Sequence, residues 1–401
     1  MKQSRAIDSD RSRGDARPRP APAPERPLEF CEVYTDLEAA RAAWAELEDC
    51  AIATPYQGFA FVRAWLETIG HASRVTPFIV VARDGTGRVN VLLPFVLIRI
   101  GPLLFGEFAG GKDSNFNMGL FRPGVVIDRA ALVDLLGRAA AMASPRVAGF
   151  LCLNQPQDWQ GANNPMLAPG AQASPSNGYK SALGADYSAW LNAHYSRAAH
   201  KKLRKKSQRL DAIGPVIHRI ARDAASAQAM LNAYVTQKEA REREHGLSGS
   251  WDRAQTLAYV TQASLAASNP APLELHALVC GDRLVAVFGG LPCQDRFCGM
   301  FISYHAEPEI ARCSPGEILL KHIIRNLIER RFATFDLGVG EARYKARCCE
   351  TEEQLFDSFI PIGVAGRLLG VALLGKQRAK RFVKQSPSIW TLVRQLRRRG
   401  G

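Results

Sequence analysis

Ser314, Pro315 and Gly316 stand directly before a run of apolar residues with helical spacing, and their types suit the start of an anion-binding helix. Serine is favoured at the capping position and proline in the first turn, while glycine removes the side chain that would hold a ligand away from the backbone. Free N–H groups and the positive end of the helix dipole then attract an anion such as a diphosphate. The predicted cofactor-binding residues are Ser314, Pro315, Gly316, Glu317 and Ile318. Taken alone, the tripeptide also fits an ordinary helix start.

The helix that would carry this site extends over about residues 316–331, and its apolar residues share one face. These are Leu320, Ile323, Ile324 and Leu327, a pattern that predicts packing on a sheet. Three apolar, β-branched runs joined by short polar turns predict an antiparallel meander before the helix, at 273–279, 284–291 and 297–303. A short strand at 334–337 and a last strand at 355–362 are predicted after it.

The chain before this meander predicts a further α/β unit and several helices. The first unit comprises a strand (28–33), a helix that begins with Thr35 and Glu38 at capping-box spacing, a helix (59–69) and a hairpin (76–82 with 89–98). A glycine- and asparagine-rich loop (106–117), a helix (129–142), a strand (146–153) and a polar crossover (154–182) complete it. The second unit opens with a long helix (187–212), a strand (216–220) and a helix (225–244).

Length and composition indicate a soluble globular protein with two folded units, because 401 residues exceed one ordinary core and 47% of them are hydrophobic. The predicted division is a disordered Pro/Arg-rich leader (1–27), two α/β units (28–182 and 183–365) and a basic helical tail (366–401). No apolar run approaches the roughly 20 residues that span a bilayer, and the N-terminus lacks a signal core. A cytoplasmic location is therefore predicted.

The nine cysteines are scattered without the spacing of a disulfide framework, which predicts free thiols. No CxxC pair or paired histidine completes a tetrahedral zinc shell, so no metal site is predicted. The net charge of +14 is local: seven Lys/Arg lie within 197–209 and ten lie within 366–401, with no acid in either segment. Each basic segment therefore needs its own explanation.

Three meandering strands, a helix that begins with Ser-Pro-Gly and one further strand, in that order, resemble the acyl-CoA-binding half of the GNAT acyltransferases. Several segments narrow the resemblance to the cellulose- and exopolysaccharide-associated GNAT-like acetyltransferases: Tyr304, 314–320, 335–338 and 340–345, with the basic helix 200–206 and 92–95. The resemblance covers roughly residues 28–362. It implies two tandem GNAT-like units, each a mixed, mainly antiparallel sheet flanked by helices, similar to the aminoacyltransferases that build peptidoglycan cross-bridges.

The resemblance also implies direct attack of the acceptor on acyl-CoA in a ternary complex, which needs a base for the acceptor and an acid for the departing thiolate. Asp336 and Glu341 are the candidate bases, and Tyr344 is the candidate acid. Caps, ion pairs or packing are the alternative roles of these three residues. Cys348 and Cys349 stand where the family has an aromatic residue. The first unit has no comparable helix start and is expected to supply structure and a substrate wall.

Arg241, His245 and Lys345 are the predicted substrate-binding residues, with a solvated helix face as the alternative for the first two. The basic segment 201–206 could pair with phosphates of CoA or of a nucleotide- or lipid-linked sugar, or could be solvated. A tail that contains Ile389 and Trp390 beside arginines has the composition of an interfacial helix at anionic lipid, and a helix folded back on the domain is equally compatible.

The resulting hypothesis is an acyl-CoA-dependent N- or O-acyltransferase, with acetyl-CoA as the first candidate donor. It would act on an amine or hydroxyl of a polysaccharide or cell-envelope precursor, with no metal and no nucleic-acid partner. An aminoacyl-tRNA-dependent aminoacyltransferase of the same fold is the first alternative. The second is a catalytically idle basic adaptor at a membrane or on nucleic acid.

Overall fold

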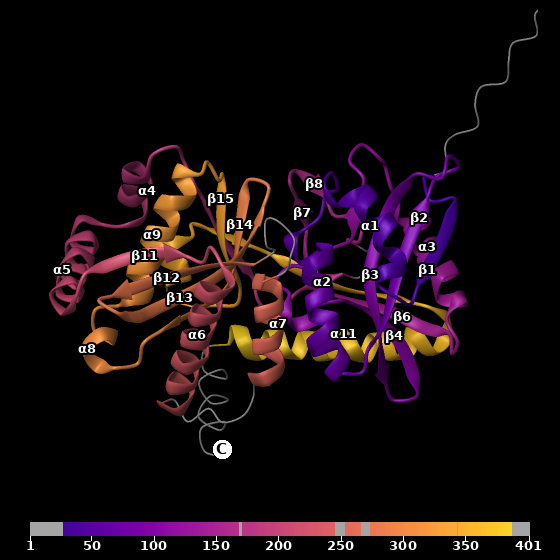
Figure 1. Cartoon of the computed structure of the whole chain (residues 1–401). Coiled ribbons are helices and arrows are strands. Elements are labelled where there is room, and N and C mark those ends of the chain that lie inside the picture. The colour runs from indigo at the N-terminus through magenta and orange to yellow at the C-terminus, as the bar shows by residue number, and fades with distance from the viewer. Residues whose placement is uncertain (1–26, 168–170, 245–252, 266–272, 343, 387–401) are drawn as a thin grey trace, which may run out of the picture.

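The computed structural model describes residues 27–167, 171–244, 253–265, 273–342 and 344–386. Within these residues the chain forms two large mixed sheets, one of eight strands and one of seven, which lie side by side in Figure 1. Helices flank both sheets. This arrangement confirms the predicted fold class of two tandem α/β units.

The first sheet begins as an antiparallel meander. Its strands are β1 (Phe30–Tyr34), β2 (Thr76–Arg83), β3 (Val89–Ile100) and β4 (Leu103–Phe108). β6 (Val147–Pro156) then pairs with β4 in parallel, after the connection that contains α3 (Arg129–Met142). α1 (Arg41–Glu48) contacts β3, and α2 (Phe59–Trp65) follows it along the chain. The predicted hairpin is confirmed, whereas the predicted loop at 106–117 is wrong in its first residues, which complete β4.

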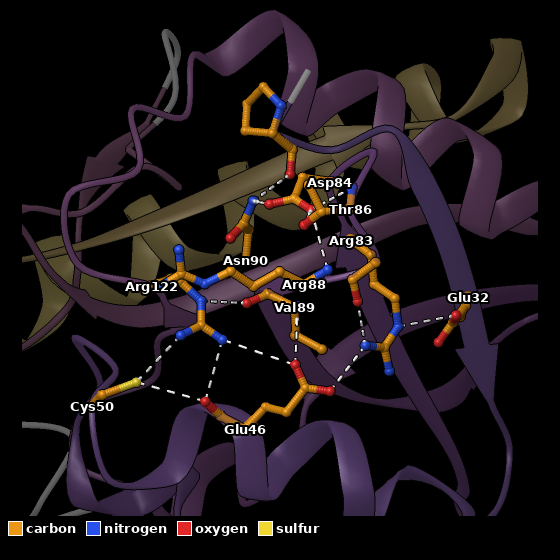
Figure 2. Close-up of polar contacts among 12 residues, drawn as sticks. Glu32, Glu46, Cys50, Arg83, Asp84, Thr86, Arg88, Val89, Asn90 and Arg122 are labelled. Carbon is orange, nitrogen blue, oxygen red and sulfur yellow. Dashed lines mark hydrogen bonds and ion pairs between the residues drawn. The ribbon is translucent and has the colours of Figure 1, made fainter. Parts of the chain in front are cut away.

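A polar network joins α1 to the end of the β2–β3 hairpin (Figure 2). Arg83 lies 3.1 Å from Glu32 and 3.0 Å from Glu46. Glu46 also accepts a hydrogen bond from the Val89 amide at 3.2 Å, and Arg122 donates to the Val89 carbonyl at 2.7 Å. These charge-assisted bonds fix the helix to the backbone of the hairpin.

The second sheet repeats the meander and its parallel fifth strand. β11 (Val216–Ile220), β12 (Glu274–Cys280), β13 (Arg283–Cys293) and β14 (Arg296–Tyr304) are antiparallel, and β15 (Thr334–Val339) pairs with β14 in parallel. α9 (Pro315–Glu329) connects these two strands. Alternate residues of the sheet face opposite sides: Leu275 and Ala277 belong to the core that includes α6 (Ala224–Glu244), whereas Leu278 belongs to the core under α9.

The two units share strands and core. β10 (Gly178–Ala182) pairs with β15 and with β16 (Thr351–Glu353) in the second sheet. β17 (Leu355–Pro361) instead pairs with β6 in the first sheet, and α11 (Gly363–Gln385) contacts both of these strands. The sheets therefore do not follow the predicted division after residue 182. β10 precedes this division but belongs to the second sheet, and β17 follows it but belongs to the first. β7 (Asp158–Trp159), β8 (Ala162–Asn163) and β9 (Gln172–Ala173) occupy part of the predicted crossover.

Several predicted helix boundaries are corrected by local bonds. The predicted helix 187–212 is two helices, α4 (Tyr187–His194) and α5 (Arg197–Ile213), because Tyr195 is extended and Ser196 caps the second through the amide of Ala199. The predicted capping box at Thr35 is wrong, since Asp36 accepts the amide of Ala39 instead. α7 (Arg253–Leu265), α8 (Pro308–Ala311) and α10 (Lys345–Cys348) were not predicted.

Candidate active site

The second sheet opens where β14 and β15 part. The parallel pairing joins 296–298 to 334–336 and goes no further, although β14 continues to Tyr304 and β15 to Val339. Asn115 of the first unit fills this opening: its side chain donates to the Gly299 carbonyl at 3.0 Å and accepts from the Val339 amide at 3.2 Å. The first unit thus fixes the separation of the two strands at the point where they diverge.

The N-terminus of α9 adjoins the outer end of β14. Ser314 precedes the helix in the left-handed region, at φ 55° and ψ 57°, and its side chain caps no amide of the helix. The predicted capping role of Ser314 is therefore wrong: its hydroxyl accepts a hydrogen bond from Lys206 Nζ at 2.6 Å. The Ser314 carbonyl instead accepts from the amides of Glu317 and Ile318. This geometry attaches the basic helix α5 to the start of α9.

A cavity of about 390 Å³, here called the α9 cavity, lies at this N-terminus. Ser314, Gly316 and Glu317 line it, which brings together three of the five predicted cofactor-binding residues. Pro315 and Ile318 are buried, and Ile318 lines a different cavity, described below. A Cβ atom on Gly316 would stand 3.5 Å from the side chains of Ile302 and Tyr304, an ordinary van der Waals contact.

Three cations surround the α9 cavity: Lys206, Arg241 and Arg347. The Arg241 guanidinium lies 5.0 Å from the centre of the Tyr304 ring. The single carboxylate among the lining residues, Glu317, lies 2.7 Å from Arg347. The formal charge of the lining is therefore positive, and it is concentrated where the helix dipole also favours an anion.

A second cavity of about 460 Å³, the α6 cavity, continues along β14. It shares four lining residues with the α9 cavity: Arg241, Ile302, Tyr304 and Tyr344. Its far side comprises residues of α6, including Gln237 and Glu242, with Ser303 of β14. The Ser303 hydroxyl donates to Gln237 Oε1 at 2.7 Å. Two adjoining cavities thus meet beside Tyr344.

Tyr344 is the one predicted catalytic residue that lines these two cavities. Burial raises the pKa of its hydroxyl to about 12, with a further increase from Cys348 and an opposing effect of Arg241. The phenol is consequently protonated at neutral pH and able to donate a proton. The two cysteines that replace the expected aromatic residue are buried behind it, and burial raises the pKa of the Cys348 thiol to about 11.

Asp336 lines neither cavity. It is fully buried on β15, where its carboxylate accepts from Arg296 Nε at 2.8 Å and from the Gly338 amide at 2.9 Å. Arg296 also bonds Glu353 at 2.7 Å and lies 4.1 Å from the centre of the Trp159 ring of the first unit. Burial raises the pKa of Asp336, against the lowering effect of Arg296. The geometry places this carboxylate in a buried ion pair within the second sheet, at the point where the first unit contacts Arg296 through Trp159.

The other predicted site residues are separated from one another. Glu341 is exposed in the loop after β15 and lines neither cavity. Lys345 is buried, and its ammonium donates to the carbonyls of Gly338 and Val339 at 3.2 and 3.0 Å; burial lowers its pKa to about 8. Arg241 lies between the two cavities. His245 lies outside the described residues.

Sequence reasoning missed much of the lining of the two cavities, including the polar residues Tyr234, Gln237, Lys238, Glu242, Ser303 and Arg347. Glu242 is the carboxylate that the α6 cavity presents. Its signal in the sequence was weak, because it is one of several charged residues at the end of α6, and helical spacing alone does not distinguish a cavity-facing residue from a solvated one.

A third, smaller cavity of about 180 Å³ lies between α5 and α9 and is called the α5–α9 groove. Its lining is rich in basic side chains, namely His200, Arg204, Lys321, His322 and Arg325. Tyr187 and Ile318 also line it, and the Arg325 guanidinium lies 4.6 Å from the centre of the Tyr187 ring. Lys206, two residues after Arg204 on the same helix, lines the α9 cavity, so α5 connects the two sites.

Residues 197–346 match the family model described as an acetyltransferase (GNAT) domain. The match begins with α5 and ends within α10, so it contains α9 and every lining residue of the α9 and α6 cavities except Arg347. It assigns an acetyltransferase (GNAT) domain, and with it the chemistry of an acyltransferase, to this part of the chain. No curated protein matches the chain.

Solved structures share the fold across most of the chain. FemX has a TM-score of 0.55 at 8% identity, with 82% of this chain and 96% of that chain covered. A conserved protein of unknown function from Bacteroides thetaiotaomicron has a TM-score of 0.52 at 11% identity, with 82% and 99% covered. A tandem GNAT protein from the clavulanic acid biosynthesis pathway has a TM-score of 0.44 at 12% identity, with 84% and 99% covered. The likeness to FemX and to the Bacteroides protein, at these identities, concerns the fold alone.

Among the described residues, no group of three His, Cys, Asp or Glu side chains is arranged to hold a metal ion.

Proposed function

We propose that the chain transfers an acyl group, with acetyl as the first candidate, from acyl-CoA to an amine or hydroxyl of a polysaccharide or cell-envelope precursor. The reaction would proceed by direct attack in a ternary complex. The observation that carries this proposal is the α9 cavity, where three cations and a helix N-terminus surround a glycine beside two diverging strands.

The donor would bind with its diphosphate in the α9 cavity. The amide of Gly316 and the side chains of Lys206 and Arg347 supply the donors and the charge for this group. The α5–α9 groove offers further cations to the 3′-phosphate, which CoA carries on its ribose. The thioester would then point along β14 toward Tyr344, where the α6 cavity begins.

The acceptor would enter the α6 cavity. Tyr344 is placed between the cavities, so we propose that it protonates the thiolate that leaves. Glu242 is the carboxylate in the lining of the α6 cavity, and we propose it as the base, in addition to the candidates from the sequence, Asp336 and Glu341. Arg241 and Lys238 would contact an anionic part of the acceptor.

Calorimetric titration with CoA and acetyl-CoA tests the donor. The wild-type chain should bind both, and Gly316→Glu should weaken binding by at least about tenfold because it places bulk and negative charge in the cavity. Gly316→Ala is the matched control: its methyl group fits at 3.5 Å from its neighbours, so its affinity should stay within about threefold of wild type. Equal unfolding midpoints would exclude a folding defect.

Absence of heat with millimolar CoA would refute the donor assignment. Titration with 3′-dephospho-CoA separates the two phosphate sites. If wild type binds this compound more weakly than CoA, and Arg204→Gln binds the two compounds equally, the groove binds the ribose phosphate. Equal affinity for the two compounds would leave the α9 cavity as the donor site and remove the groove from it.

An aminoacyl-tRNA donor is the second candidate. The observation in its favour is α5, where Lys201, Lys202, Lys205 and Arg209 are exposed on a helix adjoining the α9 cavity. Binding of tRNA through these side chains would weaken steeply as salt rises, because each phosphate contact releases a counterion. Tight, salt-sensitive tRNA binding without acetyl-CoA binding would select this alternative.

A further inference from the structure

α11 presents two different faces. One face packs on the first sheet, where Gly366 lies against the carbonyl of Ala148 and Gly370 against the ring of Phe359. A side chain at either glycine would collide with these groups. Hydrogen bonds on the same side hold the helix: Arg381 donates to the Ser174 carbonyl at 2.6 Å, and Lys384 donates to the Ser176 hydroxyl at 2.9 Å.

The opposite face carries an apolar stripe that faces solvent. Val364, Leu368, Val371 and Phe382 are 74%, 74%, 77% and 65% exposed. Their spacing of four, three and eleven residues places them along one line of an α-helix with 3.6 residues per turn. The stripe therefore lies directly away from the two glycines. A helix stabilised solely by its own domain would have its apolar residues on the packed face.

Basic side chains flank the stripe. Arg367 and Arg378 lie on one side of it by helical position, and Lys376 and Lys380 lie on the other, all exposed. No aspartate or glutamate occurs between residues 363 and 385. Apolar residues along the centre and cations at both edges form the pattern of a helix that lies in the plane of a bilayer surface.

We propose that α11 is a membrane-docking helix that places the protein on an anionic lipid surface, with the stripe among the acyl chains and the flanking cations at the headgroups. A second copy of the chain fits this face less well, because the cations beside the stripe of one copy would repel those of the other. Within the described residues no helix is long and apolar enough to cross a bilayer. The helix runs along the lower part of the first unit in Figure 1.

The predicted interfacial segment around Ile389 and Trp390 lies outside the described residues. The residues of α11 line none of the three cavities, so its contact with a membrane would not depend on the acyl donor.

Co-sedimentation of the full chain with vesicles tests the proposal. Wild type should bind vesicles of equal phosphatidylglycerol and phosphatidylcholine at least about tenfold more tightly than pure phosphatidylcholine vesicles, because each Lys or Arg near an anionic surface strengthens adsorption by about fivefold. Leu368→Glu with Val371→Glu should reduce binding to the anionic vesicles by at least about tenfold. Val126→Glu is the matched control, since Val126 is 87% exposed in the first unit outside α11, and it should bind like wild type.

Three outcomes would overturn the proposal. Wild type could fail to bind anionic vesicles. The double variant could bind them as well as wild type, which would assign adsorption to other basic segments. Vesicle-free ultracentrifugation could show a wild-type dimer that the double variant abolishes, which would assign the stripe to contact between copies. CoA titration of both variants reports separately on the donor site and should match wild type.

Discussion

Tyr344 is the residue on which the proposed chemistry depends most directly, because it lines both the α9 and the α6 cavities. Tyr344→Phe removes the hydroxyl and keeps the ring. Turnover should fall by about 100-fold, the size of a lost general acid, while the Kd for acetyl-CoA stays within about threefold. Steady-state kinetics and calorimetry on the same preparation check both values. An unchanged kcat would leave Tyr344 with a packing role.

Glu242→Gln tests the base. The amide keeps the size of the side chain but cannot accept the proton of the acceptor, so kcat should fall by about 100-fold while the Kd for acetyl-CoA stays within about threefold of wild type. Glu239→Gln, on the same helix and absent from both cavity linings, is the matched control. Equal turnover of all three proteins would return the base assignment to Asp336 and Glu341.

Asp336 has a separate, structural prediction. Asp336→Asn leaves Arg296 buried with Glu353 as its remaining partner, so the free energy of unfolding should fall by about 2–4 kcal/mol. Chemical denaturation measures this change. If turnover instead falls by orders of magnitude with stability unchanged, Asp336 is catalytic as the sequence suggested.

Side chains with suitable chemistry could be identified from the sequence, but their positions in the fold could not. The Ser-Pro-Gly segment does lie at a cavity, yet the role of Ser314 depends on Lys206, which precedes it by 108 residues. Asp336 and Glu242 are both acids near predicted active-site elements, and only tertiary packing places one in an ion pair and the other in a cavity lining. Local spacing contains no information about either partner.

At the level of elements, the edge of the second sheet contains a histidine pair: His276, which is buried, and His218, which is half-buried. His218 of β11 and His276 of β12 are 3.0 Å apart, and His276 lies 2.8 Å from Glu274. Burial lowers the pKa of His218 to about 3, helped by the charges of His276 and His322 and opposed by Glu274. Burial also lowers the pKa of His276, against the raising effect of Glu274.

Acid should destabilise this edge. A histidine with a lowered folded pKa is fully stabilising above its unfolded value of about 6.5, and the contribution is lost as pH falls below that value, because the unfolded chain binds the proton more tightly. Between pH 7.5 and 5.0 the free energy of unfolding should fall by about 1–2 kcal/mol through this group. His218→Gln should reduce that dependence, as measured by denaturation at both pH values. An identical pH dependence would mean that the pair does not titrate on unfolding.

Elements with a strong period were predictable from the sequence. α3 was predicted with both ends correct, and the meander of β12, β13 and β14 was predicted in order, because alternation and turn residues are local signals. α5 was fused to α4 because basic residues continue the helical composition across Ser196, and the break depends on the burial of Tyr195.

For the whole molecule, the exchange of β10 and β17 makes the two units dependent on each other. A fragment of residues 1–182 lacks β17, the partner of β6, and a fragment of 183–401 lacks β10, which pairs with β15. Each fragment should therefore lack cooperative unfolding when expressed alone, whereas the full chain should unfold as one unit. Calorimetry of the three proteins measures this. A cooperatively folded 1–182 fragment would contradict the prediction.

The resemblance to the GNAT-like acetyltransferases implied the tandem arrangement, but nothing in the sequence indicated the exchange. β17 has the composition of any buried strand, so its pattern predicts a strand without naming its sheet. Its position depends on the unpaired edge of β6 and on the close packing of Gly366 and Gly370 of α11 against the first sheet. Both are properties of the folded chain.

The late position of β17 also matters while the protein is being made. The ribosome releases β6 about 200 residues before β17, a delay of roughly 10 to 40 seconds at ordinary rates of protein synthesis. During that time β6 has an unfilled edge, which is a surface for pairing with strands of neighbouring nascent chains. The first sheet is thus among the earliest parts to be synthesised and among the last to close, and the yield of native protein should depend on how well that edge is protected on the polysome.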